Sequence, residues 1–151
     1  MKILVLGDVF GPSGVNAIKK YLPKIIKEKK IDFVVLNGEN AGDKGVGITK
    51  KNTEEFFNAG ADVITLSSYA ATPTRLAKYN RQDEFEALQK AAINAAKQAC
   101  DDMGLSTLIA GTLPPLPGSY RPSERLGSQL SQQEYQRISE QQYKHVDLFL
   151  C

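Results

Sequence analysis

The chain has 151 residues, of which 42% are hydrophobic and 24% are charged, values that are ordinary for one compact globular domain. Its net charge of +2 is too small to indicate a nucleic-acid partner or an acidic membrane surface, and no apolar run is long enough to cross a bilayer. Its two cysteines resemble neither a disulfide framework nor a zinc cluster. We therefore expect one cytoplasmic domain over residues 1–151, with no nucleic acid and no membrane among its partners.

Five apolar, β-rich runs recur along the chain and alternate with helical patterns. Runs that are hydrophobic on both sides suit the strands of a buried parallel sheet. Because strands and helices alternate, the sequence predicts an α/β domain with a parallel sheet. The five expected strands are residues 2–8, 32–40, 62–66, 106–111 and 146–151.

The helical patterns carry recognisable start and stop signals. An apolar stripe over residues 13–30 predicts a first helix, which Pro23 should kink or interrupt. Thr49 can cap a second helix that ends near Gly60. A long apolar face predicts a helix over residues 85–103, and the capping box "SQQE" at 131–134 predicts the start of the last one.

The use of basic and amide residues changes along the chain. Residues 1–65 contain 10 Lys, no Arg and no Gln, whereas residues 66–151 contain 4 Lys, 5 Arg and 9 Gln. A protein surface has no physical need for such a division. The change therefore has two explanations, chance in a small sample or two parent sequences joined near residue 65.

Acidic side chains follow the first two expected strands. Asp8 ends "LGD" and Glu39 lies in "NGEN", at the sheet edge where open α/β proteins bind ligands. Two close carboxylates repel each other unless a cation or a proton lies between them. Mg²⁺ or Mn²⁺ would accept these oxygens, with Asn40 adding a carbonyl. Loop capping is the alternative role for the same residues.

The stretches "GDVFGPSG", "NGENA" and "AGADVIT" make residues 1–65 similar to the bacterial calcineurin-like metallophosphoesterases that hydrolyse 2′,3′-cyclic nucleotides. This resemblance implies that Asp8, Glu39 and, less directly, Asn40 are ligands of a dinuclear metal centre. The family follows "ADVIT" with a Gly-Asn-His motif, but this chain has Leu66 and then Ser67-Ser68-Tyr69. The resemblance therefore covers half of a metal site.

Residues from about 59 to 151 resemble a different family, the homocysteine S-methyltransferases. The stretches that carry this resemblance are "AGADVITLSSYAATPTRLAKY", "IAGTLPPLPGSYRP" and "VDLFLC". It implies a fragment of a (β/α)₈ barrel, with substrate at the carboxyl ends of the strands. The zinc-binding cysteines of that family lie in later strands, so Cys151 is expected to be a strand residue and Cys100 a core residue.

Both families share "AGADVIT", so we interpret the chain as a chimera of two parents that meet within residues 59–66. Deliberate construction is favoured over natural recombination. The expected fold is a three-layer α/β domain whose five-stranded parallel sheet has the flavodoxin-like order 2-1-3-4-5, with residues 1–65 from one parent and 66–151 from the other. The alternative is an open half (β/α)₈ barrel that closes by pairing with another copy.

Neither inherited active site is complete, because His145 is the only histidine and the zinc thiolates are absent. We predict no catalytic function, no required cofactor, weak binding of Mn²⁺, Mg²⁺ or iron at Asp8, Glu39 and Asn40, and no zinc. The alternatives are residual cyclic-nucleotide phosphodiesterase activity and binding of a homocysteine-like substrate. The last two strands are apolar on both sides, so we also predict a homodimer that uses them.

Three further features have two interpretations each. The long Pro/Gly/Ser-rich segment 112–130 is either a substrate lid carrying Tyr120 and Arg121 or, as we favour, a barrel-mouth loop without its partners. His145 is more plausible near a helix end in solvent than as a base or ligand. "GDKGVG" at 42–47 lacks the spacing of a phosphate-binding loop and is expected to be a turn.

Overall fold

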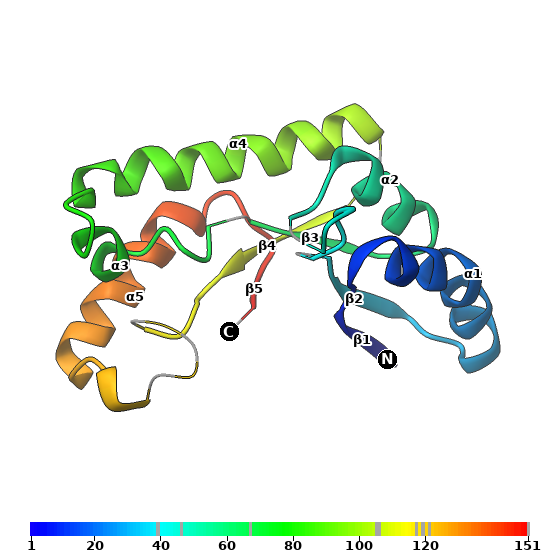
Figure 1. Ribbon diagram of the computed structural model, residues 1–151, viewed down its shortest axis with the longest axis horizontal. Coiled ribbons are helices and arrows are strands. Elements are labelled where there is room, and N and C mark those ends of the chain that lie inside the picture. The colour runs from blue at the N-terminus through cyan, green and yellow to red at the C-terminus, as the bar shows by residue number, and fades with distance from the viewer. Residues whose placement is uncertain are drawn as a thin grey trace. The chain divides into compact units, whose positions relative to one another are not determined.

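The computed structural model describes residues 1–38, 40–45, 47–66, 68–104, 107–116, 118, 120 and 122–150. The chain divides into two compact units, Met1–Val63 and Ile64–Cys151, and each is α/β with parallel strand pairs (Figure 1). In chain order the elements are β1 (Ile3–Asp8), α1 (Gly11–Lys29), β2 (Phe33–Asn37), α2 (Lys50–Asn58), β3 (Val63–Thr65), α3 (Pro73–Ala77), η1 (Gln82–Glu84), α4 (Phe85–Met103), β4 (Leu108–Thr112), η2 (Pro122–Glu124), α5 (Ser128–Gln142) and β5 (Leu148–Leu150).

In the first unit, β1 and β2 form a parallel pair in which Ile3 lies opposite Phe33 and Leu6 opposite Leu36. One face of this pair is packed by α1 and the end of α2. Leu22, Val34 and Ala59 are buried there, and the alternate β1 residues join them because strand side chains alternate between faces. The other face of β1 is open, with Val5 69% exposed.

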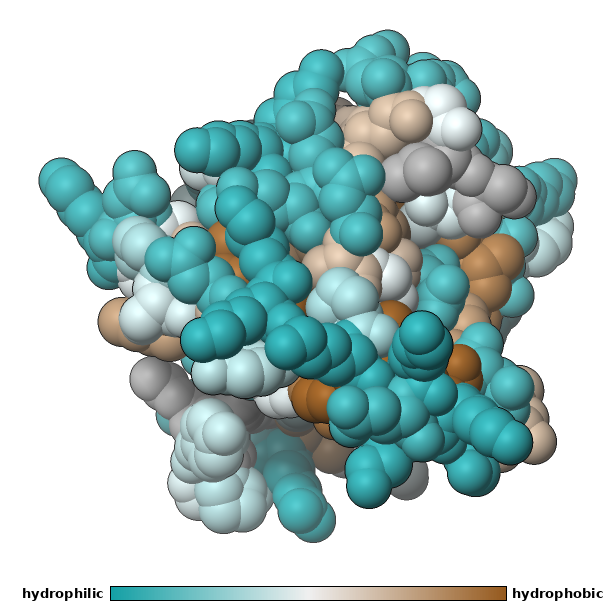
Figure 2. All heavy atoms as spheres, turned by 90° about the vertical axis from the view of Figure 1, so that its right-hand side faces the viewer, coloured by the Kyte–Doolittle hydropathy of each residue, from teal (hydrophilic) through white to brown (hydrophobic). Residues whose placement is uncertain are grey.

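Helix α1 continues through Pro23 to Lys29, so of the two effects expected of this proline, a kink or an interruption, the interruption does not occur. Proline lacks only one helical hydrogen bond, and the apolar stripe that includes Val15 and Leu22 keeps the helix against the sheet. The opposite side of α1 is rich in exposed lysine. Hydrophilic side chains accordingly predominate on the face of the molecule shown in Figure 2.

Strands β3, β4 and β5 form a three-stranded sheet in that order, most of which belongs to the second unit. Leu66 donates its backbone N–H to Ala110 of β4, and Ala110 lies opposite Leu148 of β5. Helix α4 packs Ile93 and Ala96 on this sheet. A second cluster joins α3, α4, α5 and the loop after β4 through the side chains of Leu76, Phe85, Leu116 and Ile138.

The expected single five-stranded sheet in the order 2-1-3-4-5 is not confirmed, because the described strands form one sheet of two strands and another of three. The expected order placed β1 beside the third strand. Instead Asp62, the residue before β3, donates its N–H to the carbonyl of Val34 in β2, at 3.1 Å. The start of the third strand therefore lies next to β2.

The same aspartate clamp occurs at the amino ends of three strands, β2, β3 and β5. In each clamp, an aspartate just before one strand makes two hydrogen bonds to a single residue at the start of another strand. The aspartate's backbone N–H donates to the carbonyl of that residue, and the aspartate's carboxylate accepts the backbone N–H of the same residue. The backbone bonds measure 2.8–3.1 Å and the carboxylate bonds 2.6–2.8 Å. The clamps are Asp32 on Lys2, Asp62 on Val34 and Asp147 on Ile109.

The predicted helix caps have mixed outcomes. Thr49 caps α2 in a capping box with Asn52, as its position predicts. The last helix instead begins at Ser128, three residues before the expected box, and Glu134 accepts hydrogen bonds from Thr74 rather than capping its own helix. In the part of the chain that the structure describes, none of the helices combines the length and apolar character that crossing a bilayer requires.

Candidate functional site

Asp8 and Asn40 meet at the carboxyl edge of the β1–β2 pair. Asp8 is the last residue of β1, and Asn40 follows β2. The Asn40 side chain donates Nδ2–H to the Asp8 Oδ2 atom at 2.8 Å. Two backbone bonds fix the loops that carry them, from Val9 N–H to the Asn37 carbonyl and from Gly11 N–H to the Asn40 carbonyl, both 2.9 Å. The site is therefore held from both strands.

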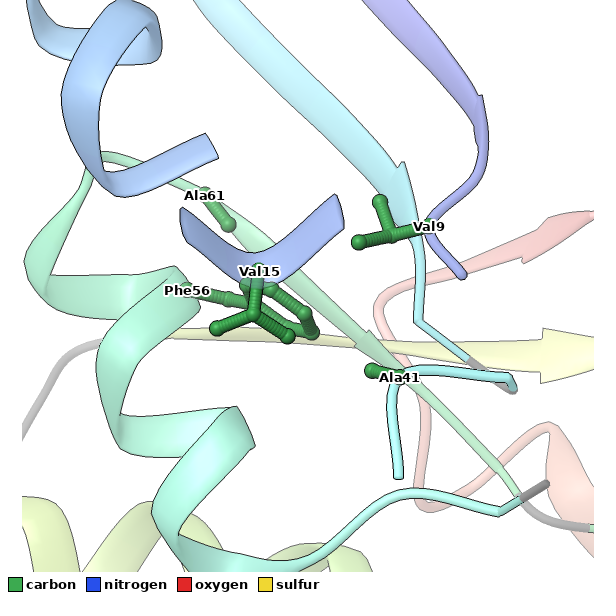
Figure 3. Packing of buried hydrophobic residues seen from close by; sticks show 5 residues of the cluster. All are labelled: Val9, Val15, Ala41, Phe56 and Ala61. Carbon is green, nitrogen blue, oxygen red and sulfur yellow. The ribbon is translucent and has the colours of Figure 1, made fainter. Parts of the chain in front are cut away.

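A small hydrophobic cluster includes the residues that directly follow Asp8 and Asn40. Val9, the residue after Asp8, is 6% exposed, and Ala41, the residue after Asn40, is 1% exposed. Figure 3 shows both side chains near Val15 of α1 and Phe56 of α2. Because each polar residue adjoins a buried one, the packing of Val9 and Ala41 helps to position Asp8 and Asn40.

The described residues of the glycine-rich segment, 42–45 and 47, form a turn. Two of their amides bond within the segment, from Gly42 N–H to the Gly47 carbonyl at 2.8 Å and from Gly45 N–H to the Gly42 carbonyl at 2.7 Å. Gly45 has φ +72°, and a Cβ there would collide with the Phe10 ring. The positive φ favours glycine at this position, because a residue with a Cβ rarely adopts it.

The residues of this edge fit a metal centre only in part. Asp8 supplies a carboxylate and Asn40 an amide, but Asn40 presents its nitrogen, not its oxygen, to Asp8. Glu39, the second carboxylate expected here, lies outside the described residues. Within the described ranges, no three His, Cys, Asp or Glu side chains are grouped so that they could hold a metal ion. One carboxylate and one amide do not make a dinuclear centre.

His145 and Cys100 both have local partners in the second unit. His145 lies three residues beyond α5, is exposed, and has its Nδ1 atom 3.0 Å from Lys97 Nζ. Cys100 packs against the α4 cluster. Burial, followed by the charges of Asp101 and Asp147, raises the pKa of the Cys100 thiol, which disfavours the thiolate that a nucleophile or metal ligand needs.

The segment after β4 folds partly onto its own unit. Leu116 is buried, and the Pro114 carbonyl accepts a hydrogen bond from the Tyr135 hydroxyl at 3.0 Å. Tyr120, the aromatic residue of the lid interpretation, is fully exposed beside a cavity of about 250 Å³. Arg121 lies outside the described residues. A lid role for this segment stays a prediction.

Sequence reasoning missed a buried polar network in the second unit. Gln142 is 0% exposed; its Nε2 donates to Gln89 Oε1 at 2.9 Å and to Ser68 Oγ at 3.3 Å. Its Oε1 accepts the N–H of Thr112, whose hydroxyl lies 2.9 Å from Ser68 Oγ. The sequence contained one indication of this burial. Gln142 lies four residues after the apolar Ile138, a spacing that puts both side chains on the same face of α5.

This network lies where the second unit's strands end, but its chemistry is structural. Ser68 follows β3 and Thr112 ends β4, so both are at the carboxyl edge of the sheet. Among the described side chains, every buried nitrogen and oxygen atom has a hydrogen-bond partner. The Ser68 hydroxyl bonds the Gln142 amide and the Thr112 hydroxyl, and neither of these described partners is a general base. They hold α5 to the sheet.

Comparison of the fold finds a solved homocysteine methyltransferase, MmuM from Escherichia coli in its metallated form. The match has a TM-score of 0.54 and covers 99% of this chain and 52% of the other. Sequence identity is 17%, so the likeness concerns the fold alone.

Sequence comparison finds relatives of a different kind. The chain is 41% identical over 69 residues to the 2′,3′-cyclic-nucleotide 2′-phosphodiesterase of Bacillus subtilis (strain 168). A relative from Mycoplasma pneumoniae is 35% identical over 69 residues. These alignments cover 46% of this chain but 26% and 24% of the relatives, so the chain spans about a quarter of their length. The sequence model of the YmdB-like proteins matches residues 4–91, which is more than half of the chain. The chain therefore belongs to the YmdB-like protein family.

Proposed function

We propose that this chain is an α/β scaffold without a complete catalytic apparatus, and that it keeps one part of a metallophosphoesterase-like cation site at Asp8. The observation that carries the proposal is the Asp8–Asn40 pair at the carboxyl edge of β1 and β2. A carboxylate held beside an amide can take part in weak Mn²⁺ or Mg²⁺ binding, with Glu39 as a third oxygen ligand. The proposal includes no zinc and no required cofactor.

We propose no catalysis because the described part of the chain brings together too few metal-ligating side chains for metal-dependent hydrolysis. Its single histidine, His145, already lies beside Lys97 in the second unit. Hydrolysis of a phosphodiester by a metal-dependent route needs an ion that activates water and stabilises the developing charge. Asp8 and Asn40 alone would hold such an ion too weakly for turnover. The cyclic-nucleotide activity named for the Bacillus relative is therefore not proposed for this chain.

We also propose that two parent sequences meet within residues 59–66. The change from Lys to Arg and Gln near residue 65 and the unit boundary between Val63 and Ile64 support this junction. The fold likeness to a methyltransferase covers 99% of the chain, residues 1–65 included, so it does not separate the two parts. The family match runs on to residue 91, past the junction, so it argues for a longer phosphoesterase-like part. The bond from Asp62 to Val34 of β2 is not the contact expected for the flavodoxin-like order 2-1-3-4-5.

Loss of the Asp8 carboxylate is expected to weaken Mn²⁺ binding by about tenfold or more, which corresponds to about 1.4 kcal/mol. Titration calorimetry of the wild type and Asp8→Asn measures this. Asp43→Asn, an exposed acid in the adjacent turn, is the matched control and should leave the affinity unchanged. Neither protein should hydrolyse 2′,3′-cyclic AMP above background. Mn²⁺-dependent hydrolysis that disappears in Asp8→Asn would contradict the proposal.

Self-association is expected to use β5, which lies at the margin of its sheet with all three residues half-buried. Phe149 packs against the backbone of Gly111, so Leu150 is the side chain on the other face. Leu150→Lys should convert a concentration-dependent dimer into a monomer in sedimentation velocity. Tyr143→Lys, at an exposed position outside the strand, should not. A strict monomer at every concentration is the contrary result, and a dimer that survives Leu150→Lys would point to the exposed face of Val5.

A further inference from the structure

A groove of about 340 Å³ lies between α4 and the end of α5, in the second unit. Ile93, one of its apolar lining residues, is 5% exposed and belongs to the core cluster under α4. The groove is lined by successive turns of α4 and by the carboxyl end of α5 with the residues after it. The polar lining residues are Glu86, Lys90, Asn94, Lys97, Gln141 and His145.

The contact between Lys97 and His145 determines which hydrogen-bonding groups the groove offers. Lys97 Nζ lies 3.0 Å from His145 Nδ1. An ammonium group has three donors and no acceptor, so this contact is a hydrogen bond when Nδ1 accepts and the ring proton is on Nε2. In that arrangement the ring presents an N–H donor on the side away from Lys97.

The other lining groups add donors of the same kind. Lys90 and Lys97 are seven residues apart on α4, about two turns, and Asn94 lies between them on the same side of the helix. Glu86 is the one carboxylate in the lining and stands one turn before Lys90. Two ammonium groups against one carboxylate leave the groove with net positive charge, together with amide and imidazole N–H donors.

We propose that this groove binds a tetrahedral oxyanion, either free phosphate or the phosphate of a monoester. Phosphate is an acceptor-only ligand with several oxygens, which matches a site whose histidine, lysines and amides can all donate. A transition metal does not fit, because His145 Nδ1 is occupied and the chain has no second histidine. The site is separate from Asp8, which belongs to the first unit.

His145 is the only histidine, so its imidazole signals in a long-range ¹H–¹⁵N spectrum report on this groove without ambiguity. Inorganic phosphate is titrated at pH 7.5 and constant ionic strength, with chloride as the replaced anion. We expect a saturable shift of the Nε2 signal. Lys90→Met should weaken the apparent affinity about threefold to tenfold, because it removes one charge-assisted donor.

Lys90→Met is preferred to Lys97→Met, since Lys97 contacts the ring and its loss would change the spectrum without any ligand. Lys78→Met is the matched control, an exposed lysine of the same unit that pairs with Glu124 instead. An unchanged affinity in that variant supports the proposal. A shift that does not saturate, or an equal loss in both variants, overturns it and leaves an adventitious ion only.

A second titration with adenosine 5′-monophosphate distinguishes the two sources of phosphate. Tighter binding than inorganic phosphate, again weakened in Lys90→Met, assigns the groove to a phosphomonoester. Equal or weaker binding assigns it to the free anion. No saturable response to either compound overturns the proposal and makes Lys97 and His145 a surface pair.

Discussion

Gln142→Ala is expected to lower the free energy of unfolding by about 3–5 kcal/mol, one of the two largest effects predicted for a single change in this chain. The side chain is fully buried and bonds Gln89, Ser68 and the Thr112 amide. Alanine removes all three bonds and leaves the Thr112 N–H and the Gln89 Oε1 without partners away from water. It also creates a cavity, whose cost adds to that of the unpaired groups.

Urea denaturation followed by circular dichroism measures the change, and two further variants separate its causes. Gln142→Met fills most of the space, so it should cost less, about 2 kcal/mol, from the unpaired groups alone. Gln133→Ala, an exposed glutamine of the same helix, should stay within about 0.5 kcal/mol of the wild type. A loss below about 1 kcal/mol for Gln142→Ala would mean that water enters and replaces the amide.

Leu22→Ala is expected to lower the free energy of unfolding by about 2–5 kcal/mol. Leu22 is 1% exposed and packs with Val34 of β2 and Ala59 after α2, so it joins the three elements that support the Asp8 edge. Alanine leaves a cavity that the helix cannot close, because the sheet and α2 hold it on both sides. The same denaturation experiment provides the value.

Tyr21→Ala is the matched control for this change, since the two residues are adjacent on α1 and Tyr21 is half exposed. Its cost should stay below about 1 kcal/mol. If the two variants lost equal stability, the packing assigned to the α1 stripe would be wrong.

The order of helices and strands could be predicted because apolar runs and caps are local signals. Thr49 caps α2 where its position predicts, and five strands lie within or close to the expected ranges. The pairing of strands was not predictable in the same way. It depends on which strand's backbone Asp62 reaches, and the hydrophobic pattern of a strand contains no information about its neighbour.

The candidate site was predictable where its residues follow strands directly. Asp8 and Asn40 converge because parallel strands end at a shared edge, and this follows from topology alone. The role of Gln142 was missed, because a glutamine on a helix is usually solvated and its burial depends on partners more than 50 residues away. Glu134 is similar: its local pattern predicts a cap, but a distant threonine binds it.

The aspartate clamps at the strand starts have a consequence for how such chains evolve. Each clamp uses an aspartate from one strand and only backbone N–H and C=O groups from its neighbour. Every residue except proline offers those two groups, so a strand that brings its own aspartate can dock on a strand of almost any sequence. A strand–helix module can therefore be transferred between unrelated proteins at its amino end without matched side chains. The carboxyl ends of the strands, where Asp8 and Thr112 lie, take no part in the clamps, so their side chains can change during evolution without loss of this docking.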